Sequence, residues 1–115
     1  MSVFTVTEQE KTRWQLKGAK ALAELLNNAF HEKLPAIDWR LATGSALIGE
    51  IQHPGVTPAQ KREQFDAWTL YLGGTAEPEV TTAGGRTTLL TKIKRHPAYD
   101  VDITVYTEFY ADEQG

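Results

Sequence analysis

The chain has 115 residues, of which 41% are hydrophobic and 23% are charged, with a formal net charge of −3 and no cysteine. This length suits one domain over residues 1–115, and the small negative charge excludes a general attraction to nucleic acid or anionic lipid. The lack of cysteine excludes disulfides, thiol nucleophiles and thiolate metal sites. No stretch approaches the roughly 18 apolar residues of a membrane span, so we expect a cytoplasmic protein with no membrane partner.

Two helices are expected, and each follows a threonine. The first runs from Glu8 to about Lys33 after Thr7, with apolar side chains at helical spacing in its last two turns. The second runs over residues 58–72 after Thr57, with proline at its first position and glycines directly after its end. Each threonine can cap an N–H of the first turn while the side chain three residues later reaches back to it. The expected buried face of the second helix carries Phe65, Trp68 and Leu72.

Between the helices, two short strands are expected around a glycine turn. Apolar and polar residues alternate over residues 37–42 and again over residues 47–52. A two-residue loop would put the two apolar sets on opposite faces, whereas a three-residue loop at 43–45 puts them on one face. We favour the longer loop, because it places Trp39 opposite Gly49, where the glycine leaves room for the indole. Trp39 is then expected in the core.

Three further strands are expected after the second helix, over residues 79–83, 86–95 and 101–110. The glycines at 84–85 suit a type I′ hairpin turn between the first two. The last strand has the most regular alternation in the chain. The predicted fold class is α+β, with an antiparallel four- to five-stranded sheet, two helices on one face and the order α-β-β-α-β-β-β. The other face of the sheet is expected to be open to water.

Residues that could carry catalysis are few and scattered. The histidines His31, His53 and His96 lie in separate segments without the spacing of a metal site, and we expect them exposed in turns. Asp100 and Asp102 share one side of a strand, as a general acid and base would, but a polar outer face gives the same spacing. The paired glycines before Arg86 lack the helix N-terminus that a phosphate site needs. The sequence therefore favours a protein that is not an enzyme and uses no cofactor or metal.

The open sheet face is the expected binding site. If the helices cover the side that carries the apolar residues of the last strand, the side chains that project together into solvent are Lys92, Lys94, Thr104, Tyr106 and Tyr110. Exposed tyrosines offer a protein partner a large amphipathic area at small entropy cost. Tyrosines beside lysines can also stack bases and contact phosphates of single-stranded nucleic acid. Asp102 and Glu108 on the same face favour the protein partner. These side chains are also what any solvated strand face of high β propensity would carry.

The last strand is also expected to mediate self-association. Residues 99–110 are rich in Val, Ile, Thr and Tyr, contain no proline, and would lie at the sheet edge in a simple meander. Asp102 and Glu108 alone guard this expected edge, so a second copy or a partner peptide can add a strand to it. A symmetric homodimer through the C-terminal strand is the simplest closed result.

Most of the chain resembles a known group of proteins. The resemblance rests on residues 34–41 (LPAIDWRL), 46–51 (ALIGEI) and 64–73 (QFDAWTLYLG), and on the closing valine-rich strand. The chain resembles small uncharacterised α+β proteins found in actinomycetes and their phages. The resemblance implies a shared fold, and it carries over no activity and no functional residue.

Three functions are therefore open from the sequence. The favoured one is a protein-interaction or adaptor module that acts through the open sheet face or a free strand edge. The first alternative is binding of single-stranded nucleic acid through Tyr106, Tyr110, Lys92 and Lys94. The second is a small-molecule site between the helices and the sheet, near Trp14, Trp39 and Trp68.

Overall fold

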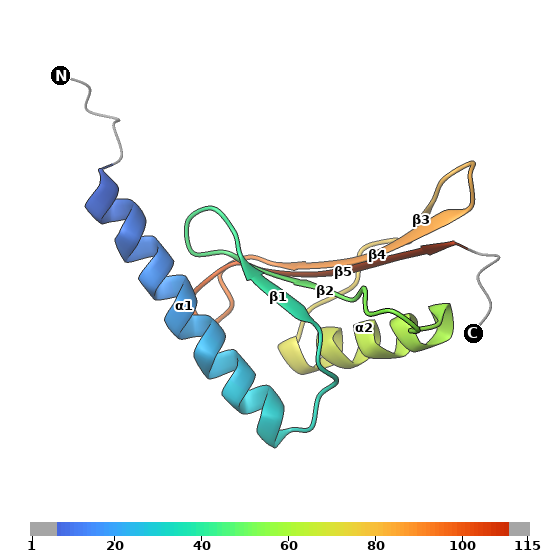
Figure 1. Ribbon diagram of the computed structural model, residues 1–115, viewed down its shortest axis with the longest axis horizontal. Coiled ribbons are helices and arrows are strands. Elements are labelled where there is room, and N and C mark those ends of the chain that lie inside the picture. Colours follow the sequence, from blue (N-terminus) through green and yellow to red (C-terminus); the bar gives the residue numbers. More distant parts are fainter. Residues whose placement is uncertain (1–6, 111–115) are drawn as a thin grey trace.

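The structure, a computed structural model, describes residues 7–110 as two helices and five strands (Figure 1). Helix α1 spans Glu8–His31 and helix α2 spans Pro58–Leu72. The strands are β1 (Asp38–Leu41), β2 (Leu47–Glu50), β3 (Val80–Thr81), β4 (Arg86–Ile93) and β5 (Ile103–Tyr110). Both helices lie on one side of the sheet, and no described element covers the other side. The predicted α+β class is confirmed, with two helices and a five-stranded sheet.

Both helices begin at the predicted threonines. Thr7 accepts a hydrogen bond at its side-chain oxygen from the Glu10 N–H, at 3.1 Å. Thr57 accepts the equivalent bond from the Gln60 N–H, at 3.1 Å, and the Gln60 side chain accepts from the Thr57 N–H, at 2.9 Å. Gly73 ends α2 in the left-handed conformation, with φ of 74°, which costs glycine little. The caps thus position the start of both helices and the end of α2.

The strand order is β1-β2-β5-β4-β3, and the sheet is mixed. β2 and β5 pair in parallel, whereas the other three neighbouring pairs are antiparallel. The prediction of a purely antiparallel sheet is therefore wrong. After β2 the chain crosses below the sheet as α2, builds β3 and β4, and returns beside β2 as β5 (Figure 1). Such a crossover connection is what parallel pairing requires.

β5 lies in the middle of the sheet, so the prediction that residues 99–110 form an edge strand is wrong. Its main chain is hydrogen-bonded to β2 on one side and to β4 on the other. The apolar and threonine side chains at alternate positions of β5 are all buried, and a central strand can bury them completely. A homodimer through this strand therefore has no unpaired edge to form on. The two outer strands of the sheet are β1 and β3.

The predicted register of the first hairpin is confirmed. Trp39 lies opposite Gly49, and Leu41 lies opposite Leu47. A Cβ atom on Gly49 would lie 2.9 Å from Cη2 of Trp39, closer than side chains tolerate, so the indole occupies the space that glycine leaves. The hairpin also presses against α1, where a Cβ on Gly18 would overlap the side chain of Leu41. Glycine is thus required at two points of close approach.

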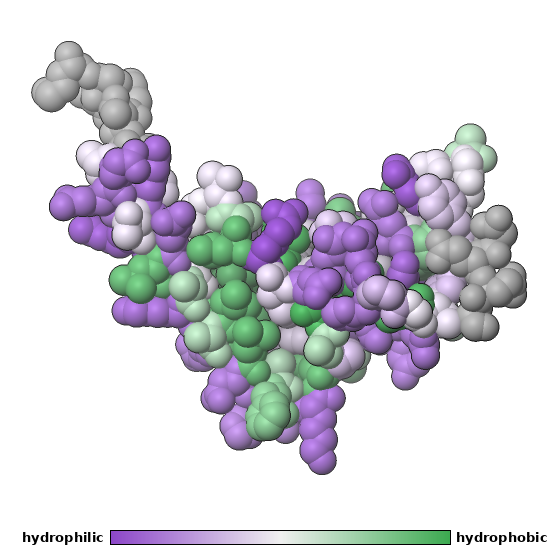
Figure 2. Space-filling model, in the orientation of Figure 1, coloured by the Kyte–Doolittle hydropathy of each residue, from purple (hydrophilic) through white to green (hydrophobic). Residues whose placement is uncertain are grey.

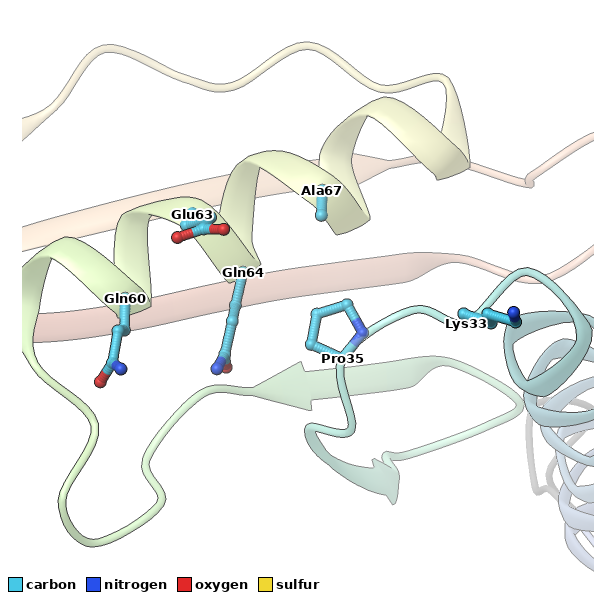
Figure 3. Close-up of a pocket in the computed structure, with 6 residues that line it drawn as sticks. All are labelled: Lys33, Pro35, Gln60, Glu63, Gln64 and Ala67. Carbon is cyan, nitrogen blue, oxygen red and sulfur yellow. The ribbon is translucent and has the colours of Figure 1, made fainter.

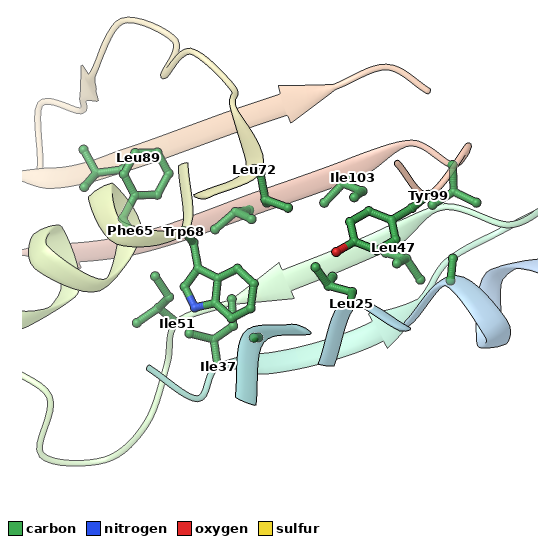
Figure 4. Packing of buried hydrophobic residues seen from close by; sticks show 14 of the residues in the cluster. Leu25, Ile37, Leu47, Ile51, Phe65, Trp68, Leu72, Leu89, Tyr99 and Ile103 are labelled. Atoms are coloured by element: carbon green, nitrogen blue, oxygen red, sulfur yellow. The ribbon is translucent and has the colours of Figure 1, made fainter. Parts of the chain in front are cut away.

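The core lies between the helices and the sheet (Figure 4). Trp68 is 1% exposed, as predicted, and its Nε1–H donates to the carbonyl of Pro35 at 2.8 Å. Trp39 packs against this core edge-to-face with Trp68, at 5.3 Å between ring centroids, but it is only partly buried. Its predicted burial is therefore confirmed in part. The buried side chains labelled in Figure 4 are Leu25, Ile37, Leu47, Ile51, Phe65, Trp68, Leu72, Leu89, Tyr99 and Ile103.

His96 is buried, so the prediction of exposed turn histidines is wrong at this position. The side chain is 8% exposed. Its Nε2 lies 2.9 Å from the carbonyl oxygen of Leu72, and its Nδ1 accepts from the Ala98 N–H at 3.0 Å. Because a carbonyl only accepts, Nε2 carries the proton. The imidazole thereby satisfies a carbonyl at the end of α2 that has no partner inside the helix. His31 is exposed and His53 is partly exposed.

The turn between β3 and β4 also differs from the prediction. The Thr82 N–H donates to the carbonyl of Arg86 at 2.9 Å, which closes a loop of three residues. Gly85 has φ of 87°, whereas a type I′ turn would need positive φ at both glycines. β3 has two residues, Val80–Thr81, in place of the five expected.

Candidate functional site

The uncovered face of the sheet, called here the open face, presents side chains in rows that cross the strands. The pairing register places these rows, because directly paired residues point to the same face. One row contains Arg40, Ile48, Thr104 and Lys92. The next contains Asp38, Glu50, Tyr106 and Leu90. A third contains Glu108, Thr88 and Val80, and the last contains Tyr110 and Arg86.

The five predicted site residues are spread along this face. Lys92 and Thr104 are paired neighbours, and Tyr106 lies in the adjacent row. Lys94 follows the end of β4 and lines a hollow of about 170 Å³ with Lys92, Thr104 and Asp102. Tyr110 lies four residues beyond Tyr106, roughly 13 Å along the strand. The structure thus brings the two lysines and Thr104 together, with Tyr106 beside them and Tyr110 apart.

Tyr106 is partly buried and held by polar neighbours. Burial raises the pKa of its phenol, and a hydrogen bond to Glu50 raises this pKa further, while Arg40 acts in the opposite direction. Glu50 comes from β2 and Arg40 from β1, so three strands meet at this hydroxyl. The ring also has Leu90 as its direct neighbour on β4. Burial and the neighbouring Glu50 and Arg40 thus distinguish Tyr106 from a fully exposed tyrosine.

Charges on the open face largely neutralise one another. The Arg86 guanidinium lies 3.8 Å from the Glu108 carboxylate, and Arg40 and Glu50 share Tyr106. Among residues 7–110, Lys92 and Lys94 are found in no ion pair. Two lysines at one end of a surface that carries both charges form a small basic patch and not a continuous basic groove.

Arg40, Glu50, Ile48 and Leu90 were not predicted as site residues. The alternation in the first hairpin already placed Arg40 and Glu50 on the face opposite Trp39. Arg40 and Glu50 lie near Tyr106 only because β2 pairs in parallel with β5, and the sequence carries no local signal for this pairing.

The three tryptophans do not line one pocket. Trp14 borders a hollow of about 520 Å³ between the start of α1 and the loop after β1. Trp39 and Trp68 border a separate apolar hollow of about 200 Å³ that Leu26 and Phe30 also line. A third hollow, of about 360 Å³, lies between α2 and the segment after α1 (Figure 3). Gln60 and Gln64 extend side by side from α2 there, and the buried Oε1 of Gln64 has no hydrogen-bond partner among the described residues.

The acidic residues singled out from the sequence have structural partners. The Asp100 carboxylate lies 3.1 Å from Lys17 Nζ and 3.2 Å from Arg95 Nε. The hydrogen bond from Lys17 holds the pKa of Asp100 below its ordinary value. Asp102 accepts from the Arg95 N–H at 2.8 Å. In residues 7–110, no three His, Asp or Glu side chains are placed to hold a metal ion, and no helix is long and apolar enough to cross a membrane.

Comparisons with known proteins complete the description of the site. No family model matches the sequence, and neither curated proteins nor solved structures give a match. The resemblance to small actinomycete and phage proteins stays a prediction.

Proposed function

We propose that the protein is an interaction module whose open face binds a protein partner. One observation carries this proposal: the partly exposed apolar centre of the face is bordered by side chains of both charges. Ile48, Tyr106 and Leu90 form the centre, while Arg40, Glu50 and the Arg86–Glu108 pair surround it. Protein interfaces have this anatomy, with an apolar centre and a polar rim.

The expected partner is a folded protein with an apolar patch inside a mixed-charge rim. A strongly basic or acidic ligand would gain little at the centre, because side chains of both charges border it. Tyr106 supports such a partner, since a tyrosine offers a large contact area and has few rotatable bonds to immobilise on binding. Single-stranded nucleic acid remains the alternative outcome, and it would engage Lys92, Lys94, Tyr106 and Tyr110.

A pull-down with matched leucine variants tests the proposal. The full chain would be immobilised as wild type, Leu90→Glu and Leu70→Glu, and partners from the source organism would be identified and then purified. Leu70 is 82% exposed on α2, on the opposite layer, so it provides the same substitution away from the open face. We expect the purified partner to bind wild type and Leu70→Glu, and to bind Leu90→Glu at least tenfold more weakly.

Fluorescence anisotropy with a labelled oligothymidine at low salt separates the two candidate functions. Binding that falls steeply with salt and is lost in Lys92→Glu would favour nucleic acid and contradict the protein-binding proposal. A purified partner that binds all three leucine variants equally would also contradict it.

A further inference from the structure

β1 presents main-chain hydrogen-bonding groups on its outer side. The Ala42 N–H donates to the carbonyl of Ala46 at 2.8 Å, and bonded pairs alternate along an antiparallel ladder. The N–H and C=O groups of Asp38 and Arg40 therefore point to β2, whereas those of Trp39 and Leu41 point away from it. Within residues 7–110, no strand pairs with this outer side, and neither residue forms a main-chain hydrogen bond outside the β1–β2 ladder.

The side chains of β1 leave this edge accessible. The Trp39 indole leans over Gly49, toward β2 and away from the outer side. Natural edge strands are commonly protected by short length, charged side chains, proline or a bulge; β1 is short and carries two charged side chains, but it contains no lysine or proline. It carries one acidic and one basic side chain, Asp38 and Arg40, two residues apart on the open face.

We infer that a second copy of the chain pairs with β1 in antiparallel orientation, with Trp39 opposite its own equivalent. Only the groups of Trp39 and Leu41 can bond outward, so a two-fold axis can pass beside residue 38, 39, 40 or 41. An axis at residue 41 sets Trp39 opposite residue 43, beyond the end of β1, and pairs only Leu41 with its equivalent inside the strand. An axis at residue 38 sets aspartate against aspartate, and an axis at residue 40 sets arginine against arginine. An axis at Trp39 places Asp38 of each copy against Arg40 of the other, twice. Opposite charges in directly paired positions stabilise a sheet and like charges destabilise it.

An apolar ridge on α1 extends the same surface. Leu22, Leu26 and Phe30 recur every four residues, and Leu26 and Phe30 are 44% and 79% exposed. Leu26 and Phe30 share a hollow with Trp39, so the ridge lies next to β1. Figure 2 shows apolar side chains gathered over α1 and β1 on one side of the molecule. Pairing of four residues from each copy would by itself give only a weak contact. Helix ridges with a spacing of four residues can pack against their equivalents on another helix, so the α1 ridge would supply the apolar area of the dimer.

Charge reversal at β1 tests the dimer through its mass in solution. Sedimentation velocity of the wild-type chain over a range of concentrations should give a dimer that dissociates on dilution. Asp38→Arg and Arg40→Asp each create two like-charge pairs, and each should weaken dimerisation about tenfold or more. The double variant D38R/R40D restores both pairs and should dimerise like wild type. An equimolar mixture of the two single variants should form a heterodimer, because each then supplies the charge that the other lacks.

Matched controls separate the edge from net charge. Glu77→Arg and Lys94→Asp change the net charge by the same amounts at exposed positions outside β1, and they should leave the wild-type dimer unchanged. Circular dichroism checks that every variant is folded. A wild-type chain that stays monomeric at high concentration would overturn the inference. So would a dimer that tolerates both single reversals, or folded single variants that fail to combine in the mixture.

Discussion

The two faces of β4 and β5 differ in what the fold demands of them. On the covered face, Thr91, Val105 and Thr107 are buried almost completely beneath the helices. Their sequence neighbours Leu90 and Tyr106 project from the other face and are only partly buried. Residues one position apart therefore serve different purposes: one set is fixed by packing, whereas packing leaves the other set much freer. Evidence for function has to come from the second set.

The largest effect is expected where the covered face is filled. Trp68→Ala removes a side chain that is 1% exposed and a hydrogen bond to Pro35, and it should lower the free energy of unfolding by about 3 to 5 kcal/mol. Urea denaturation followed by circular dichroism measures this loss. A loss below about 1 kcal/mol would contradict the assignment of Trp68 to the core.

Paired threonine variants compare the faces directly within one strand. The Thr107 hydroxyl donates to the carbonyl of Ile51 at 2.7 Å, and both groups are buried. Thr107→Val leaves that carbonyl without its donor, so we expect a loss of about 1 to 3 kcal/mol in unfolding free energy. Thr104→Val makes the same change on the open face and should change the unfolding free energy by no more than about 0.5 kcal/mol. Equal losses in the two variants would remove the distinction between the faces.

An effect that appears only at high pH concerns a tyrosine of α2 on the covered side. Burial is the main cause, and a hydrogen bond with Tyr99 the second, of a rise in the pKa of Tyr71 from 10.0 to about 12. The folded protein therefore holds this proton more tightly than the unfolded chain. The resulting stabilisation is complete below about pH 10 and is lost as the pH rises through 12. Between these values, wild type should lose more unfolding free energy than Tyr71→Phe in denaturant titrations. Parallel pH profiles for the two proteins would contradict the raised pKa.

The elements that sequence predicts well are those set by local chemistry. The start of each helix follows from a threonine cap, and the end of α2 follows from Gly73. The register of β1 with β2 follows from the space above Gly49. Alternation alone assigns the two faces of β5, which places Thr104, Tyr106 and the apolar residues on the correct sides.

Strand order was not predictable in the same way. The parallel pairing of β2 with β5 joins segments far apart in the chain, and no turn residue between them reports it. The scarcity of charged residues in β5 predicts an unprotected edge, but β5 is a central strand, which needs no such protection. The contact of Arg40 and Glu50 with Tyr106 was missed for the same reason. His96 was missed because its burial depends on the end of α2 lying above it.

The seam between β2 and β5 has a consequence for how the chain folds. Leu47 on β2 pairs with Ile103 on β5, and forming this contact closes a long loop of the chain. Contacts between residues so far apart in sequence form slowly. Until β5 arrives, the β1–β2 hairpin and the β3–β4 hairpin are two separate fragments with no shared ladder. The last strand in chain order is thus the one that unites the sheet. During synthesis, the edge of β2 that β5 covers stays unpaired until the ribosome has released β5, and unpaired strand edges are prone to aggregation.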